Sequence, residues 1–198
     1  MNFAKTTRET VALCDASGLP MWLLKGRGAD AWLVERNVDV PAEIYASTHL
    51  AGGETGGGAS ANGAWVTRTG ADEFLIESKN GERHQLLEDL ASNTPEQGDL
   101  FAMERQDAVF VVTGELADNV MSQTCGIDWE RTAPDLVVMT RVAGVSCSVR
   151  RRSLNDTTCF VLRLDPTYGI YLWDQLLRIC EEEGGGVVGT GELFGEMS

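Results

Sequence analysis

The chain has 198 residues, and its 30 acidic and 16 basic side chains give a formal net charge of −14 at pH 7. Such a charge repels nucleic-acid phosphates and anionic membrane surfaces, so neither is expected as a partner. No apolar run approaches the roughly 20 residues that cross a bilayer, and residues 1–13 lack the apolar stretch of a signal peptide. We therefore expect a globular, cytoplasmic protein.

The first half of the chain contains two patterns in which a strand is followed by a helix. Met21–Lys25 has the length and apolar character of a strand, and Gly26 permits a tight turn into an apolar helix. Glu73–Glu77 is a second strand candidate, and the helix after it carries three leucines between residues 86 and 90. Other predicted elements of this half are a glycine-rich loop over 51–63, a strand over 64–69 and a linker over 92–98.

The second half repeats this order. Val109–Thr113 reads as a strand, and Gly114 opens the turn into another apolar helix. Cys159–Arg163 is the next strand candidate, followed by a helix with apolar positions between residues 170 and 180. Further strands are predicted over 136–142 and 145–152.

The two halves indicate an internal duplication, because both patterns recur at nearly the same separation. Gly26 and Gly114 lie 88 residues apart, and both belong to the motif Gly-x-x-Ala-Asp. Phe74 and Phe160, in the second pair of strands, lie 86 residues apart.

The predicted fold is α+β, with helices on one face of a largely antiparallel sheet. Residues 1–183 are expected to form a single duplicated domain of two β-α-β-β-α repeats, at about 10–91 and about 105–183. Residues 184–198 are rich in glycine and lack periodicity, which predicts an extended C-terminal tail.

Motifs of catalytic and metal sites are missing from the sequence. The glycine-rich segment 52–58 is followed by Ala59 and Ser60, where a phosphate-binding loop needs a lysine before the hydroxyl. The two histidines, His49 and His84, adjoin no convincing nucleophile, and the five cysteines form no C-x-x-C pair. We predict no catalytic, cofactor-binding or metal-ligating residue in this chain, and reduced, mostly buried cysteines.

Basic charge gathers in one part of this acidic chain. Residues 131–178 contain seven arginines and four aspartates, so this span is +3. Arg150, Arg151 and Arg152 stand together at a predicted strand end. They predict a docking site for an acidic partner, since arginine is suited to interface ion pairs; a solvated strand end is the alternative.

Three segments carry a resemblance to a known family. They are the Gly-x-x-Ala-Asp helix that runs on to Cys125–Asp128, the strand Gly70–Ile76, and Asp165–Trp173. Together they resemble the gamma subunit of heterotetrameric sarcosine oxidase. They are also similar to the folate-binding domain of the aminomethyltransferase (glycine-cleavage T-protein) superfamily, of which that subunit is a reduced member. The likeness covers about residues 10–183.

The resemblance implies a non-catalytic small subunit of a flavoenzyme with alpha, beta, gamma and delta subunits. Such complexes oxidatively demethylate sarcosine to glycine, transfer the one-carbon unit to tetrahydrofolate and release hydrogen peroxide. FAD, FMN, NAD, zinc and tetrahydrofolate would then belong to the partner subunits, and none to this chain.

Three alternatives stay open. The same architecture serves the corresponding subunit of N-methylglutamate dehydrogenase. A stand-alone tetrahydrofolate-binding protein would need a carboxylate for the pterin, such as Asp118 or Asp128; however, Asp30 and Asp118 occupy equivalent repeat positions, which favours helix capping. A free-standing interaction module or homodimer is the third.

Overall fold

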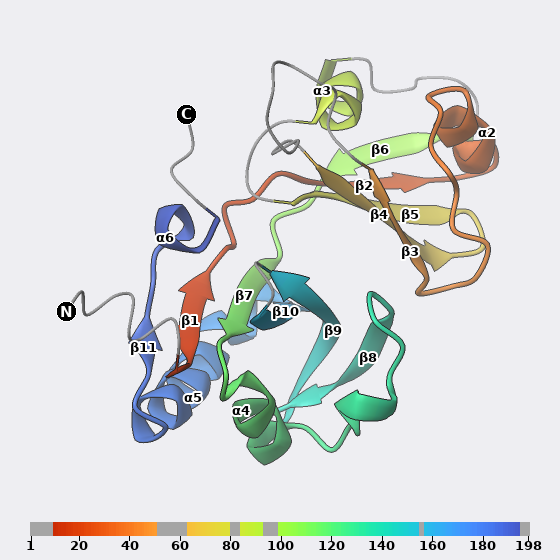
Figure 1. Cartoon of the computed structure of the whole chain (residues 1–198). Helices are drawn as coiled ribbons and strands as arrows, with labels where there is room; N and C mark the ends of the chain where they lie inside the picture. The colour runs from red at the N-terminus through yellow and green to blue at the C-terminus, as the bar shows by residue number, and fades with distance from the viewer. Residues whose placement is uncertain (1–9, 51–62, 80–83, 93–98, 155–156, 195–198) are drawn as a thin grey trace. The chain divides into compact units, whose positions relative to one another are not determined.

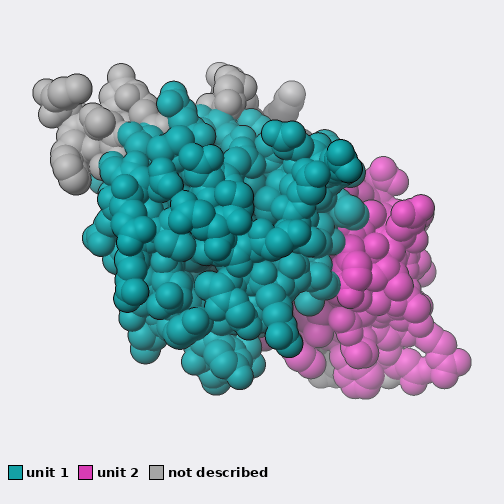
Figure 2. All heavy atoms as spheres, turned by 90° about the horizontal axis from the view of Figure 1, so that it is seen from below, with its two compact units in different colours: residues 1–18, 107–196, 198 teal, residues 19–106, 197 magenta. Residues whose placement is uncertain are grey.

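The computed structural model describes residues 10–50, 63–79, 84–92, 99–154 and 157–194. The predicted loop over 51–63 and linker over 92–98 lie outside the described residues, apart from Gly63 and Ser92. The chain divides into two compact units: unit 1 contains residues 1–18 and 107–196, and unit 2 contains residues 19–106 (Figure 2).

Unit 1 is built on a six-stranded sheet with the strand order β11-β1-β7-β10-β9-β8 (Figure 1). Its strands are β1 (Ala12–Asp15), β7 (Ala108–Thr113), β8 (Val137–Val142), β9 (Val145–Leu154), β10 (Thr157–Leu164) and β11 (Gly186–Val187). Its helical elements are α4 (Ala117–Thr124), η1 (Trp129–Arg131), η2 (Pro166–Tyr168), α5 (Gly169–Glu182) and α6 (Thr190–Phe194). Apolar residues of α4 and α5 share one core with a single face of this sheet, including Val120, Leu176 and Phe160.

Unit 2 is built on a five-stranded antiparallel sheet with the strand order β3-β4-β5-β2-β6. Its strands are β2 (Met21–Lys25), β3 (Ser47–Leu50), β4 (Ala64–Gly70), β5 (Glu73–Ser78) and β6 (Phe101–Glu104). Its helices are α2 (Ala29–Val34) and α3 (Gln85–Ser92). Leu33 of α2 and Leu90 of α3 join the core formed by Phe74 and its neighbours on one sheet face.

These observations confirm the predicted α+β class, the largely antiparallel pairing and the helices on one sheet face. The described strands form two sheets, however, and each repeat has more strands than β-α-β-β-α. The composition of 184–198 predicts an extended tail, whereas β11 pairs with β1 and α6 contacts it. Val188 and Leu193 bury their side chains there, and this burial offsets the entropic cost of ordering the glycines around them.

The strand at the start of repeat one, β1, and the strand that leads into repeat two, β6, each add to the sheet of the other repeat. β1 precedes β2 in the chain but pairs with β7, and β6 precedes β7 but pairs with β2. The two pairings have the same register: Ala12 lies opposite Thr113, and Phe101 lies opposite Lys25. The two repeats therefore exchange strands, and the unit boundaries fall after these strands rather than between the repeats.

Two glycines at equivalent positions make this exchange sterically feasible. Gly26 follows β2 with φ +122°, and Gly114 follows β7 with φ +123°. A Cβ on Gly26 would collide with the carbonyl oxygen of Asp99, and one on Gly114 would come within 2.6 Å of the carbonyl oxygen of Thr10. Both contacts are with the residues that lead into an exchanged strand, so the duplicated glycine serves close backbone approach as well as the predicted turn.

Candidate functional site

A buried arginine joins helix and sheet in unit 2. Arg68 of β4 pairs with Asp30 at 2.7 Å and donates to the carbonyl oxygens of Pro41, at 2.6 Å, and Ala71. Its guanidinium carbon lies 4.5 Å from the ring centre of Phe74. The Arg68 side chain is 11% exposed, so a low local dielectric strengthens these contacts and makes the loss of any one of them costly.

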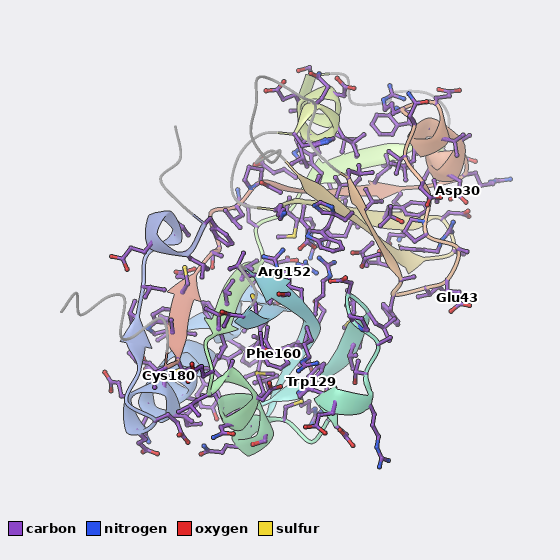
Figure 3. All side chains as sticks on the ribbon, viewed as in Figure 1. Asp30, Glu43, Trp129, Arg152, Phe160 and Cys180 are labelled. Carbon is purple, nitrogen blue, oxygen red and sulfur yellow. The ribbon has the colours of Figure 1, made fainter. Side chains whose placement is uncertain are left out.

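Unit 1 contains a looser copy of the same arrangement. Arg151 of β9 pairs with Asp118 at 3.5 Å, and its guanidinium carbon lies 6.0 Å from the ring centre of Phe160. Figure 3 labels Asp30 on α2 and Phe160 on β10. The N-cap residues of α2 and α4 are Gly28 and Leu116, and neither makes a side-chain cap bond.

The expectation that the two aspartates cap these helices is therefore corrected. Asp30 and Asp118 lie in the first helical turn, one residue after the helix begins. There the negative charge of each aspartate interacts favourably with the positive end of the helix dipole. Each aspartate also pairs with an arginine from the sheet. Asp128, the other carboxylate considered for a pterin, pairs with Arg131 at 3.2 Å.

The three consecutive arginines of β9 lie in different surroundings. Arg150 is buried, at 2% exposed, so a solvated strand end does not describe it. Arg151 forms an ion pair with Asp118. Arg152, labelled in Figure 3, is half-buried and lies opposite Cys159 of the neighbouring strand. The docking of an acidic partner by these residues stays a prediction.

The five cysteines are buried free thiols, as predicted. Burial raises the pKa of Cys14 and of Cys180 to about 12 and that of Cys147 to about 11. Burial also raises the pKa of Cys159, against the opposing effect of the Arg152 charge. Since the thiolate is the reactive form, these four thiols are unsuited to nucleophilic or redox chemistry.

The two histidines, far apart in sequence, line one cavity of about 320 Å³ in unit 2. His84 accepts the Leu86 N–H on Nδ1 at 3.1 Å, which satisfies a helix-start donor of α3. Arg36 stacks over Trp32 at 3.6 Å from the ring centre. Among the described residues, no three His, Cys, Asp or Glu side chains are grouped as metal ligands would be.

A larger cleft, of about 640 Å³, lies in unit 1 between the β8–β9 turn and the start of α5. Ala143 and Gly144 form the turn with positive φ, and Tyr171 donates its hydroxyl hydrogen to the Ala143 carbonyl at 3.2 Å. Tyr168 and Tyr171, which line the cleft, are 56% and 50% exposed. This cleft has the size and aromatic lining of a ligand or peptide pocket. The sequence of Asp165–Trp173 alone gives no sign of this cleft, because the β8–β9 turn supplies its other wall.

No described helix is long and apolar enough to cross a membrane.

Comparisons with known proteins give the relationship of the chain. The family model of the GCVT N-terminal domain matches residues 3–193. No curated protein gives a significant match. Among solved structures, the aminomethyltransferase T of the glycine cleavage system from Bartonella henselae is similar, with a TM-score of 0.68 and 16% identity. The alignment covers 94% of this chain and 49% of that one, so the chain spans about half the length of that relative.

A second similar structure is the heterotetrameric sarcosine oxidase from Corynebacterium sp. U-96, in complex with pyrrole 2-carboxylate. The TM-score is 0.67 and the identity 17%, over 94% of this chain and 95% of that one. At 16% and 17% identity, the similarity to these two structures shows the fold alone. The family is shown by the family model, which matches residues 3–193. The chain belongs to the GCVT N-terminal domain family.

Proposed function

We propose that this chain is the non-catalytic small (gamma) subunit of a sarcosine-oxidase-like flavoenzyme complex. The observation that carries the proposal is a comparison of lengths. The chain aligns with 95% of a chain of a heterotetrameric sarcosine oxidase but with only 49% of an aminomethyltransferase. A subunit of matching length that keeps the common fold fits the first assembly better than the second protein.

The proposed complex oxidatively demethylates sarcosine to glycine, passes the one-carbon unit to tetrahydrofolate and releases hydrogen peroxide. Alpha, beta and delta subunits are the proposed partners, and they would hold FAD, FMN, NAD, zinc and tetrahydrofolate. The proposed location is the cytoplasm. The corresponding subunit of N-methylglutamate dehydrogenase is the nearest alternative, because the same fold would serve either substrate.

Within such a complex, this chain would hold the other subunits together and would not take part in the chemistry. The buried thiols of unit 1 are held in their unreactive protonated form. Exposed apolar residues remain in both units, among them Ile170 in unit 1 and Phe101 in unit 2. Apolar side chains of this kind favour burial against a partner.

The direct test is an affinity purification of the tagged full chain from its native host. A yellow complex with flavin absorbance, containing larger and smaller partner proteins by mass spectrometry, is the expected result. Reduction of an artificial electron acceptor with sarcosine, compared with N-methylglutamate, would then identify the substrate, and peroxide release with sarcosine would identify an oxidase. A colourless chain recovered alone would overturn the proposal.

A stand-alone tetrahydrofolate-binding protein is the second candidate, favoured by the match to the GCVT N-terminal domain. The two carboxylates considered for the pterin are each paired with an arginine, Asp118 with Arg151 and Asp128 with Arg131. A pterin would have to compete with these pairs. Calorimetric titration of the purified chain with tetrahydrofolate decides this, and measurable binding by the chain alone would favour the second candidate.

A further inference from the structure

Strand β6 ends the unit 2 sheet, and no described strand pairs with its outer edge. Its side chains Phe101 and Met103 are 61% and 49% exposed. Apolar side chains on an unpaired edge invite pairing with another chain, which folded proteins otherwise avoid by charging or covering the edge. We therefore expect another strand or segment to cover this edge.

The counterpart of β6 in unit 1 shows how such an edge is covered. The shared register makes Ala12 the counterpart of Phe101, and Cys14 that of Met103. Ala12 and Cys14 are fully buried. In unit 1, the added strand β11 lies parallel to β1 along its outer edge. Among the residues that the structure describes, the two units thus differ at this equivalent edge, where unit 1 has one more strand than unit 2.

The hydrogen bonds of β11 in unit 1 indicate which backbone groups of β6 an added strand would bind. In unit 1, the carbonyl oxygens of Val11 and Leu13 accept the N–H groups of Gly186 and Val188, at 3.2 and 3.0 Å. By the shared register, the corresponding acceptors in β6 are the carbonyl oxygens of Leu100 and Ala102.

The donors of β6 follow from the alternation of an antiparallel pair. Arg105 donates its N–H inward to the carbonyl oxygen of Met21 at 2.8 Å. The N–H groups of Ala102 and Glu104 must then point outward. The β6 edge thus offers two donors and two acceptors beside two exposed apolar side chains.

We propose that the outer edge of β6 binds an extended strand of a different polypeptide, parallel to β6 as β11 is to β1. The partner strand carries apolar side chains to cover Phe101 and Met103, together with basic ones. The basic character follows from charge, since unit 2 has 14 acidic and 7 basic residues, a net of −7, and Glu104 is exposed on the edge itself. Self-pairing would instead bring two chains of −14 together.

This proposal rests on the proposed function for its partner, a subunit of the flavoenzyme complex. It is tested on the full chain and on the complex purified through it from the native host. Hydrogen exchange of the Ala102 and Glu104 amides is measured in both. We expect fast exchange in the isolated chain and at least roughly tenfold slower exchange in the complex, because the added strand binds these N–H groups.

A pair of substitutions isolates the backbone contribution. Glu104→Pro removes the outward N–H and places its ring on the edge, while the inward bonds to β2 are kept, a position where strands tolerate proline. Glu104→Gln removes the charge alone. We expect Glu104→Pro to weaken recovery of the partner about tenfold or more, and Glu104→Gln by less than about threefold. Circular dichroism and a melting curve of each isolated variant verify folding.

An independent pair tests the apolar contact. Phe101→Asp is expected to weaken partner recovery about tenfold or more, whereas Val34→Asp, at a site 60% exposed on α2, is expected to leave it unchanged.

The outcomes separate this proposal from the proposed function. A yellow complex in which the two amides exchange quickly, or which Glu104→Pro leaves intact, overturns the edge proposal alone. A colourless complex in which those amides are protected supports the edge and overturns the oxidase assignment. A chain recovered alone overturns both. Protection of the two amides in an isolated monomer or in a dimer also overturns the edge proposal, because the covering strand would then come from this chain or a second copy.

Discussion

Gly26 and Gly28 provide a sharp test of the strand exchange. Both have positive φ, +122° and +98°, yet their surroundings differ. A Cβ at Gly28 meets no atom within 4 Å, whereas one at Gly26 collides with the Asp99 carbonyl oxygen and lies 3.1 Å from the Leu100 Cα. Alanine at Gly28 therefore costs backbone strain alone, and alanine at Gly26 also displaces the chain entering β6.

The structure sets the size of the difference. Strain at positive φ costs about 1–3 kcal/mol at each site. Displacing Asp99 weakens the hydrogen bonds between β6 and β2, each worth about 1 kcal/mol net. It also loosens Leu100, whose side chain is 8% exposed in the unit 2 core and worth about 1.5–3 kcal/mol when buried. Gly26→Ala should thus cost roughly 2–4 kcal/mol more than Gly28→Ala.

Thermal unfolding followed by circular dichroism measures this difference. In a chain of this length, 1 kcal/mol lowers the melting temperature by about 2–4 °C, so Gly26→Ala should melt roughly 4–16 °C below Gly28→Ala. Hydrogen exchange should show the added loss in β2 and β6. Equal destabilisation by the two substitutions would refute the role assigned to the exchanged strand.

Four further predictions follow from the geometry. Arg68→Ala should destabilise the chain by about 2–4 kcal/mol and Arg151→Ala by about 1 kcal/mol or less, measured by urea unfolding, because the first arginine is more buried and more fully bonded; similar losses would contradict this. The bond from Lys25 lowers the pKa of Glu73 from its usual 4.5, so its small contribution to stability is present above pH 4.5 and lost as pH falls through the lower folded value; Glu73→Gln should remove that part of the acid dependence. The four thiols with raised pKa should resist iodoacetamide at pH 8 until urea unfolds the chain, and rapid labelling of the native chain at these sites would show that they are accessible thiolates. A fragment of residues 19–106 holds all strands of unit 2 and should unfold cooperatively, whereas residues 10–92, which form repeat one without β6, should not.

Sequence reasoning predicted the elements whose signal is local. The strands before Gly26 and Gly114, and the helices after them, combine an apolar run with a residue suited to the turn. β3 and β6 gave no such signal, because β3 has no fully buried side chain and β6 is mostly exposed. β11 has two residues and exists through its pairing with β1. The exchange itself is a pairing between segments far apart in the sequence. Hydrophobic periodicity indicates local structure and does not indicate which strands pair.

The site residues followed the same rule. The buried thiols were predictable, since free cysteine is among the residue types most often buried. The pairing of Arg68 with Asp30 was not, because the two residues lie 38 positions apart on different elements. The unit 1 cleft was also missed, since it forms where the β8–β9 turn meets the start of α5.

A duplicated chain contains its own comparison between what a fold requires and what it leaves open. Gly26 and Gly114 agree in residue type, in φ and in the strand that passes over them, so the close approach is a requirement of the fold. Phe101 and Ala12 occupy one equivalent position and differ in both size and exposure, so the fold does not require an aromatic ring there. A large exposed ring is also a liability on a sheet edge. Its presence is accounted for by a function outside the unit, which is the reason for seeking a partner at β6.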